Sequence, residues 1–196
     1  VVMSITLVAG LGNPGREYEA TRHNLGWVVV EAFARKLGLS WKTQPQFEAE
    51  VARWDAAPGR TCYFAKPLTY MNGSGTAVGA LARYYKVPLG SIVAAYDDLT
   101  TDLGLVKVSV TGSAGGHNGV ASLLEHLGDG FVRYRLGIGP KEPAQMDLKD
   151  FVLGKFTPEQ TTLITKNIET YVSGLDLLLS RGVEAAMNQL NRRDPK

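Results

Sequence analysis

Short apolar runs alternate with longer segments of helical periodicity along this chain, and the alternation restricts the fold more than any other feature. The predicted strands lie near residues 4–10, 48–54, 61–66, 91–96, 105–110 and 132–137. The predicted helices cover residues 22–37, 74–86, 117–127, 158–180 and 183–192. This pattern is typical of an α/β fold, in which helices flank both faces of one twisted sheet.

The sheet is predicted to be mixed and mostly parallel. Helices separate most of the strands, which favours parallel pairing. Runs 48–54 and 61–66 are instead joined by a short turn that contains Pro58-Gly59, so these two strands are expected to form an antiparallel hairpin. A length of 196 residues fits a single domain that spans residues 1–196.

Composition limits the classes of function only weakly. A net charge of +2 is too small to indicate nucleic-acid binding by itself, although it allows a local basic patch. The single cysteine, Cys62, excludes an internal disulfide and fits a reducing compartment, so we expect a cytoplasmic protein. No apolar stretch is long enough to span a bilayer, and the N-terminal residues do not resemble a signal peptide.

The first loop can be interpreted in two ways. Residues 10–15, Gly-Leu-Gly-Asn-Pro-Gly, fit G-x-G-x-x-G after an apolar run, which is the pattern of a dinucleotide-binding turn in nicotinamide and flavin enzymes. However, Asn13-Pro14-Gly15 is typical of a simple turn. Amphipathic spacing begins only at Leu25, with Thr21 as the expected N-cap. A lone match is weak evidence, so a nucleotide-binding oxidoreductase stays an alternative.

Polar side chains follow several of the predicted strands, where open α/β sheets bind their ligands. One histidine, one aspartate and three asparagines would meet at this edge: His23, Asp97, Asn13, Asn72 and Asn118. Each of these residues is also common in turns and helix caps, so only their number and shared position indicate a site.

A histidine that acts as a general base on water is the chemistry that this set favours. The chain has no G-x-S-x-G elbow for a serine nucleophile and no H-E-x-x-H or cysteine pair for a metal. A histidine base needs a partner that fixes its tautomer, and Asp97 could supply it. Asparagine amides can donate to a carbonyl oxygen and accept from water.

Five blocks of residues closely resemble those of bacterial-type peptidyl-tRNA hydrolases, in the same order and at matching spacing. They lie within residues 10–26, 66–75, 97–99, 115–119 and 135–139. The resemblance implies a single α/β domain, usually a monomer, that needs no cofactor or metal. It also implies an esterase that cleaves the bond between a peptide and the 3′-terminal ribose of tRNA, in contact with the 3′ CCA end and the acceptor stem.

The same resemblance implies roles for the residues at the predicted edge. His23 would be the catalytic base and Asp97 would orient it. Asn13, Asn72 and Asn118 would hold the substrate and stabilise the reacting groups.

Other matching positions would bind the substrate. The cleft for the peptide and the tRNA 3′ end would be lined by Tyr18, Met71 and His117. Lys107 and Arg135 match basic positions that contact tRNA phosphate. This sequence departs from the family at Ser109, where a second basic residue is common, and the departure weakens the expected phosphate contact.

Some questions stay open from the sequence. Certain plant organellar relatives of this fold act in intron splicing, so a non-enzymatic RNA-binding protein is the main alternative. The presence of all five expected active-site residues favours the enzyme. Residues 139–146 contain two prolines without helical spacing and are expected to be mobile. The C-terminal pair Arg192-Arg193 could also contact RNA.

Overall fold

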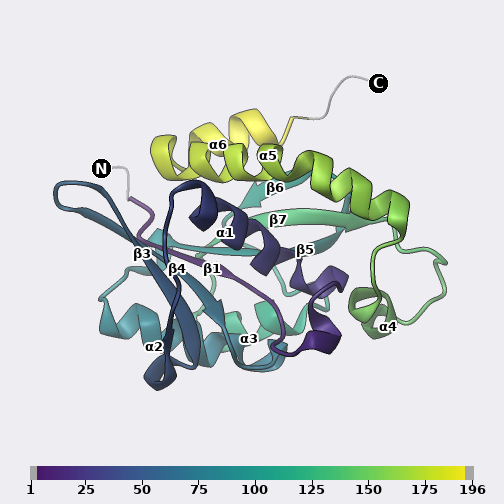
Figure 1. Cartoon of the computed structure of the whole chain (residues 1–196), viewed down its shortest axis with the longest axis horizontal. Helices are drawn as coiled ribbons and strands as arrows, with labels where there is room; N and C mark the ends of the chain where they lie inside the picture. Colours follow the sequence, from purple (N-terminus) through teal and green to yellow (C-terminus); the bar gives the residue numbers. More distant parts are fainter. Residues whose placement is uncertain (1–3, 193–196) are drawn as a thin grey trace.

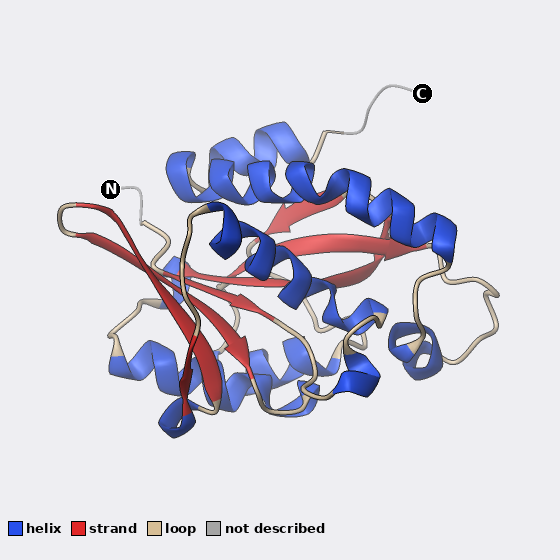
Figure 2. Cartoon of the chain, in the orientation of Figure 1, coloured by secondary structure: helices blue, strands red, loops and turns tan. Residues whose placement is uncertain are grey.

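The computed structural model describes residues 4–192, so Arg193 of the basic C-terminal pair lies outside the described residues. Its centre is a seven-stranded sheet with helices on both faces (Figure 1, Figure 2). The strands are β1 (Leu7–Gly10), β2 (Lys42–Gln44), β3 (Ala49–Ala57), β4 (Arg60–Pro67), β5 (Ile92–Asp102), β6 (Val106–Ser109) and β7 (Val132–Gly139). The helices are α1 (Leu25–Lys36), α2 (Ser74–Tyr84), α3 (Asn118–Leu127), α4 (Leu148–Leu153), α5 (Pro158–Arg181) and α6 (Val183–Leu190).

The strand order is β2-β3-β4-β1-β5-β7-β6. β1 pairs in parallel with β4 and β5, and β5 pairs in parallel with β7. The outer pairs β2–β3, β3–β4 and β6–β7 are antiparallel. The predicted α/β class and mixed sheet are therefore confirmed, with parallel strands at the centre and the expected β3–β4 hairpin at one side.

Each face of the sheet packs against its own helices, because successive strand side chains point to opposite faces. Val93 and Tyr134 belong to the core that also contains residues of α1, α5 and α6. Leu7 and Ala94 belong to the core that contains residues of α2 and α3. Figure 1 shows these two helical layers above and below the strands.

A polar strip crosses the α2–α3 face of the sheet at its β5–β7–β6 end. The strip consists of Tyr96 on β5, Arg133 and Arg135 on β7, and Lys107 on β6. Arg135 pairs with Tyr96 on one side and with Lys107 on the other, and directly paired residues share a face. Apolar residues of β7 alternate with these arginines and belong to the core that contains residues of α5, so the strip takes the opposite face, where Tyr96 and Arg133 are themselves buried.

Each predicted strand and helix is present, and one strand, one α-helix and several 3-10 turns were not predicted. β2 and α4 are too short to produce a periodic signal in the sequence. β5 extends beyond the prediction to Asp102, because it pairs again with β7 at Gly139. The prediction that Thr21 caps α1 is wrong. Its hydroxyl donates to the Tyr18 carbonyl at 2.7 Å, and a 3-10 turn, η2 (Arg22–Asn24), precedes the helix.

Glycines in the first loop bring α1 close to the central strands. A Cβ on Gly10 would clash with the Gly26 carbonyl, and a Cβ on Gly26 would clash with the Ala95 carbonyl. α1 begins at Leu25, ten residues after Gly15, so its N-terminal amides do not face the glycine turn. A dinucleotide site needs those amides at the turn, and the fold does not support that interpretation.

Among the helices within residues 4–192, none combines the length and the apolar composition that crossing a bilayer requires.

Burial of Cys62 makes its thiol a test of the packing around β4. Burial raises the pKa of this thiol to about 12, although the charge of Arg60 acts in the opposite direction. At about pH 8 the thiol is therefore protonated and shielded, and we expect the native protein to be inert toward DTNB. Protein unfolded in guanidinium should release one equivalent of thionitrobenzoate. Rapid labelling of the native protein would contradict this packing.

Candidate active site

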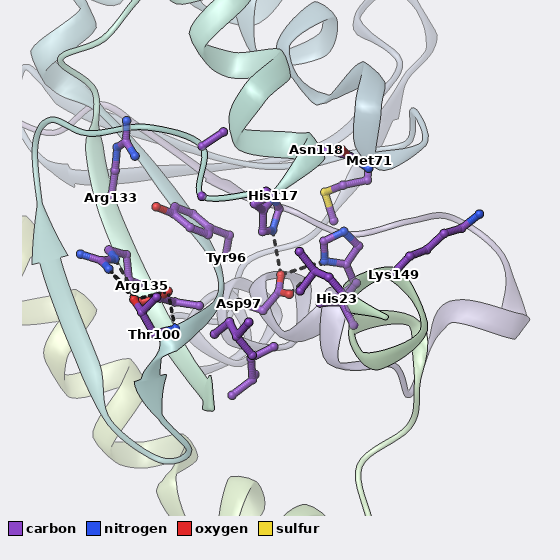
Figure 3. Close-up of a pocket in the computed structure, with 18 of the residues that line it drawn as sticks. His23, Met71, Tyr96, Asp97, Thr100, His117, Asn118, Arg133, Arg135 and Lys149 are labelled. Carbon is purple, nitrogen blue, oxygen red and sulfur yellow. Dashed lines mark hydrogen bonds and ion pairs between the residues drawn. The ribbon is translucent and has the colours of Figure 1, made fainter. Parts of the chain in front are cut away.

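A cleft of about 860 Å³ opens at the edge where the central parallel strands end. Its walls come from the loops that follow β1 and β4, from β5, and from the loop between β6 and α3. Residues 147–153, which include α4, form a further wall. Figure 3 shows that the labelled side chains of these segments surround one space. The cleft lies where the sequence predicted a site.

Two histidines bind the carboxylate of Asp97 from different elements (Figure 3). His23 Nδ1 lies 2.9 Å from Asp97 Oδ2, and His117 Nε2 lies 2.9 Å from Asp97 Oδ1. The imidazole centroids are 4.6 Å apart. The three side chains are each at most 8% exposed, so these hydrogen bonds are shielded from water. The sequence predicted the His23–Asp97 contact, and the bond from His117 is an addition.

The charge of Asp97 is stabilised by its two partners. Burial alone would raise the pKa of the Asp97 carboxyl, but the charges and hydrogen bonds of His117 and His23 outweigh burial. Its pKa is therefore held well below the ordinary value. The carboxylate remains ionised wherever the imidazoles can donate to it.

The N-terminus of α3 fixes the tautomer of His117. Its Nδ1 accepts hydrogen bonds from the backbone N–H groups of Gly119, at 3.1 Å, and Val120, at 3.3 Å. An imidazole nitrogen that accepts cannot carry a proton, so the ring proton lies on Nε2 and points to Asp97. His117 is thus both the N-cap of α3 and a hydrogen-bond donor to the carboxylate.

The same group has the spacing of a metal site. His23, Asp97 and His117 each offer a ligand atom within 4.8 Å of the others. A metal would need an unprotonated nitrogen on His117 facing Asp97. The two backbone donors at Nδ1 instead place the proton on that nitrogen. The geometry therefore favours a hydrogen-bonded chain over metal ligation.

His23 is left with a free basic nitrogen. Because Nδ1 faces the carboxylate, it carries the proton of the neutral ring, and Nε2 has an unshared pair. The ring lines the cleft beside Asp97. This arrangement can accept a proton from a molecule in the cleft while Asp97 stabilises the cation that results.

The three asparagines line the same cleft but differ in how they are held. Asn13 is buried, and its Oδ1 accepts from the Met71 backbone N–H at 2.7 Å, so its Nδ2 remains as a donor. Asn72 follows Met71 in a 3-10 turn, η4 (Met71–Gly73), and Asn118 is the first residue of α3. Asn72 and Asn118 are exposed, and neither side chain forms a hydrogen bond with another residue in the range 4–192.

Tyr18 and Met71 also lie in the cleft, as the resemblance implied. Met71 is 4% exposed and belongs to the apolar core beneath the cleft. Tyr18 meets Tyr70 edge to face, with 6.3 Å between ring centroids. Tyr70 is 60% exposed, so this aromatic pair forms a rim that a planar group could contact.

Arg135 and Lys107 lie side by side on the polar strip, at the β7–β6 side of the cleft. Arg135 lines the cleft and donates to Asp98, which fixes its guanidinium. Lys107 is its cross-strand neighbour but does not line the cleft itself. Ser109, which stands where the family often has a second basic residue, lines the cleft and pairs with Arg133. An arginine therefore lies directly beside the position at which this chain has no basic side chain.

Sequence reasoning missed several residues of the cleft. Tyr70 lies within the matching block 66–75, but the resemblance assigned it no role. Arg133 lies two residues before Arg135, and Tyr96 lies two residues before Asp98. Strand residues two apart share a face of the sheet, so this spacing could have identified both as cleft residues. Lys149 belongs to α4, which is too short for a periodic pattern.

Known proteins match both the sequence and the fold. The chain matches the family described as peptidyl-tRNA hydrolase over residues 7–196. The peptidyl-tRNA hydrolase of Gloeobacter violaceus is 41% identical over 97% of this chain and 96% of its own length. That of an Anaeromyxobacter strain is 44% identical over 95% of this chain and 96% of its own length.

A solved structure shows the same architecture. The crystal structure of peptidyl-tRNA hydrolase from Acinetobacter baumannii matches with a TM-score of 0.88 and 36% identity, over 98% of this chain and 97% of that one. Agreement of sequence and fold over nearly the full length shows that this chain belongs to the peptidyl-tRNA hydrolase family.

Proposed function

We propose that this chain hydrolyses the ester bond between a peptide, or an N-blocked aminoacyl group, and the 3′-terminal ribose of tRNA. Its family consists of hydrolases that carry this name. The observation that carries the proposal is the hydrogen-bonded chain His117–Asp97–His23, which leaves a basic nitrogen in a cleft lined by asparagine amides. An ester needs no covalent intermediate if such a base activates water.

In the first step His23 Nε2 takes a proton from a water molecule as the oxygen attacks the ester carbonyl. Asp97 stabilises the imidazolium that forms, and His117 keeps the carboxylate oriented toward His23. The attack moves the carbonyl π electrons onto oxygen and gives a tetrahedral oxyanion. A positioned base of this kind contributes about 10² to 10⁴ in rate.

In the second step the oxyanion collapses and the bond to the ribose oxygen breaks. That oxygen takes the proton back from His23, which releases the free tRNA and a carboxylic acid. Asn13 Nδ2 is the best-held donor for the oxyanion, since Met71 fixes the other end of its amide. Asn72 and Asn118 are free to hold the acyl chain or the water.

The polar strip suits the RNA part of the substrate. With the ester at His23, the 3′ CCA end would run along the cleft toward Arg135, and Lys107 would lie next to the phosphates of the acceptor stem. The resemblance implies a monomer, so we propose that one copy is sufficient for activity. The expected mobility of residues 139–146, which connect β7 to the α4 wall, stays a prediction.

Replacing His23 with alanine tests the base. We expect kcat for release of tRNA from N-acetyl-aminoacyl-tRNA to fall by at least about 10²-fold, while tRNA binding stays measurable. His126 is the matched control, because its ring bonds the Ser122 carbonyl on α3 and does not line the cleft. The His126→Ala variant should keep its turnover. A His23→Ala variant with most of its activity would refute the assignment.

Replacing His117 with asparagine tests the orienting bond. Asparagine can still cap α3 but is too short to replace the imidazole at Asp97. Since His117 lowers the pKa of Asp97, its loss should raise that pKa, which is measurable from the ¹³C shift of the Asp97 carboxyl during titration. We expect kcat to fall about tenfold, the loss of one hydrogen bond to a charged group. An unchanged pKa and kcat would leave His117 as a cleft-lining residue only.

Replacing Lys107 or Arg135 with glutamine tests the phosphate contact. Each change should raise KM more than it lowers kcat, and should reduce the slope of log KM against log salt by about one unit. Lys42 lies on β2, at the opposite edge of the sheet, and Lys42→Gln should change neither value. A loss confined to kcat would place the residue in the chemistry instead.

A further inference from the structure

We infer that Asn24 is a positioning residue of the reaction, which holds Asn13 in register with His23; the inference rests on the proposed function. The side-chain amide of Asn24 binds both polar groups of the Asn13 backbone. Asn24 Oδ1 accepts from Asn13 N at 2.9 Å, and Asn24 Nδ2 donates to Asn13 O at 2.9 Å. We call this pair of bonds the Asn24 clamp. Asn24 does not line the cleft, so it acts through Asn13.

The clamp replaces a missing strand neighbour. β1 ends at Gly10, and its last backbone bond to β5 is from Leu11 N to the Ala95 carbonyl. Asn13 comes two residues later and is only 5% exposed, so its backbone N–H and C=O need partners away from bulk water. The Asn24 amide supplies one acceptor and one donor, as a neighbouring strand would.

The ordinary reasons for an asparagine at this position do not apply. Asn24 occupies the N-cap position of α1, yet its side chain makes no capping hydrogen bond. It is 2% exposed, so it does not serve solubility. The partners also fix which end of the amide faces which group, because an N–H requires Oδ1 and a carbonyl requires Nδ2. An aspartate would place oxygen against the Asn13 carbonyl and lose one of the two bonds.

The clamp joins two segments that each carry a proposed reacting group. Asn24 directly follows His23 in the η2 turn, and the imidazole of His23 is itself anchored on Asp97. Asn13 is then fixed at three points, through its N–H, its C=O and its Oδ1, with Nδ2 left for the oxyanion. A shift of about 1 Å in such a donor can cost about 10² in rate.

The chain offers a matched control for the clamp. Asn191, just after α6, binds the backbone of Val108 in the same way: Oδ1 accepts from Val108 N and Nδ2 donates to Val108 O, both at 2.8 Å. This second clamp holds the edge strand β6 and lies outside the cleft lining. Replacing either asparagine with aspartate removes the same kind of contact, but only one of the clamps holds Asn13.

A comparison of Asn24→Asp with Asn191→Asp separates positioning from stability. We expect both variants to lower the melting temperature to a similar extent. Asn24→Asp should lower kcat at least about tenfold and leave KM within about twofold, because the oxyanion donor is used in the transition state. Asn191→Asp should keep the wild-type kcat. Equal losses of kcat in the two variants would overturn the inference.

A double-mutant cycle shows whether Asn24 acts through Asn13. In the Asn13→Ala background the donor is already absent, so adding Asn24→Ala should lower kcat less than about twofold further. The same loss in both backgrounds would mean that Asn24 supports the site in another way and would overturn the inference. If Asn24→Ala does not fold, the Asn24→Asp substitution, which preserves size, takes its place in the cycle.

A measurement without substrate distinguishes failure of the inference from failure of the proposed function. If the wild-type protein released no tRNA, the proposed function would fail, and the clamp could still be read by NMR. The side-chain NH₂ resonances of Asn13 should shift or broaden in Asn24→Asp and stay in place in Asn191→Asp. Unchanged Asn13 resonances in Asn24→Asp would overturn the inference, whatever the result of the activity assay.

Discussion

The buried carboxylate of Asp97 is the constraint on which the candidate active site depends. Its side chain is only 1% exposed, and an ionised group at such depth is costly unless hydrogen bonds compensate for lost water. His23 and His117 supply those bonds from two different elements. One charge on β5 thereby fixes the start of α1 and the start of α3 relative to the sheet. It also orders both imidazoles, since each must turn a protonated nitrogen toward it.

Close packing of α1 makes this contact geometrically available. Gly26 lies three residues after His23, and a Cβ on Gly26 would meet the carbonyl of Ala95, two residues before Asp97. Without glycine at this point the helix could not approach β5, and the imidazole would lie farther from its carboxylate. Gly10, the first glycine of the turn that resembles a cofactor-binding pattern, serves the same packing role, because a Cβ there would meet the Gly26 carbonyl.

The helices leave two kinds of polar surface within one cleft. Near His23 the cleft is lined by the neutral amides of Asn13, Asn72 and Asn118, of which Asn13 is held by Asn24 and by the Met71 backbone, and this suits a small neutral ester. The β5–β7–β6 strip carries the cations Lys107, Arg133 and Arg135, with Arg135 oriented by Asp98, which suits phosphates. A substrate with an ester at one end and nucleic acid at the other matches this division.

The sequence by itself determined the α/β class, the hairpin, and the position at the ends of the strands where the structure has its cleft. Periodicity and turn residues are local signals, so these features can be predicted from neighbours in the chain. Short elements such as α4 carry no period, and they were missed. Only the tertiary structure decided which groups touch. His117 contacts Asp97 from 20 positions along the chain, and Asn24 contacts Asn13 from 11 positions. Lys107 and Arg135 are 28 positions apart. Such pairs are set by how elements pack, which no local pattern encodes.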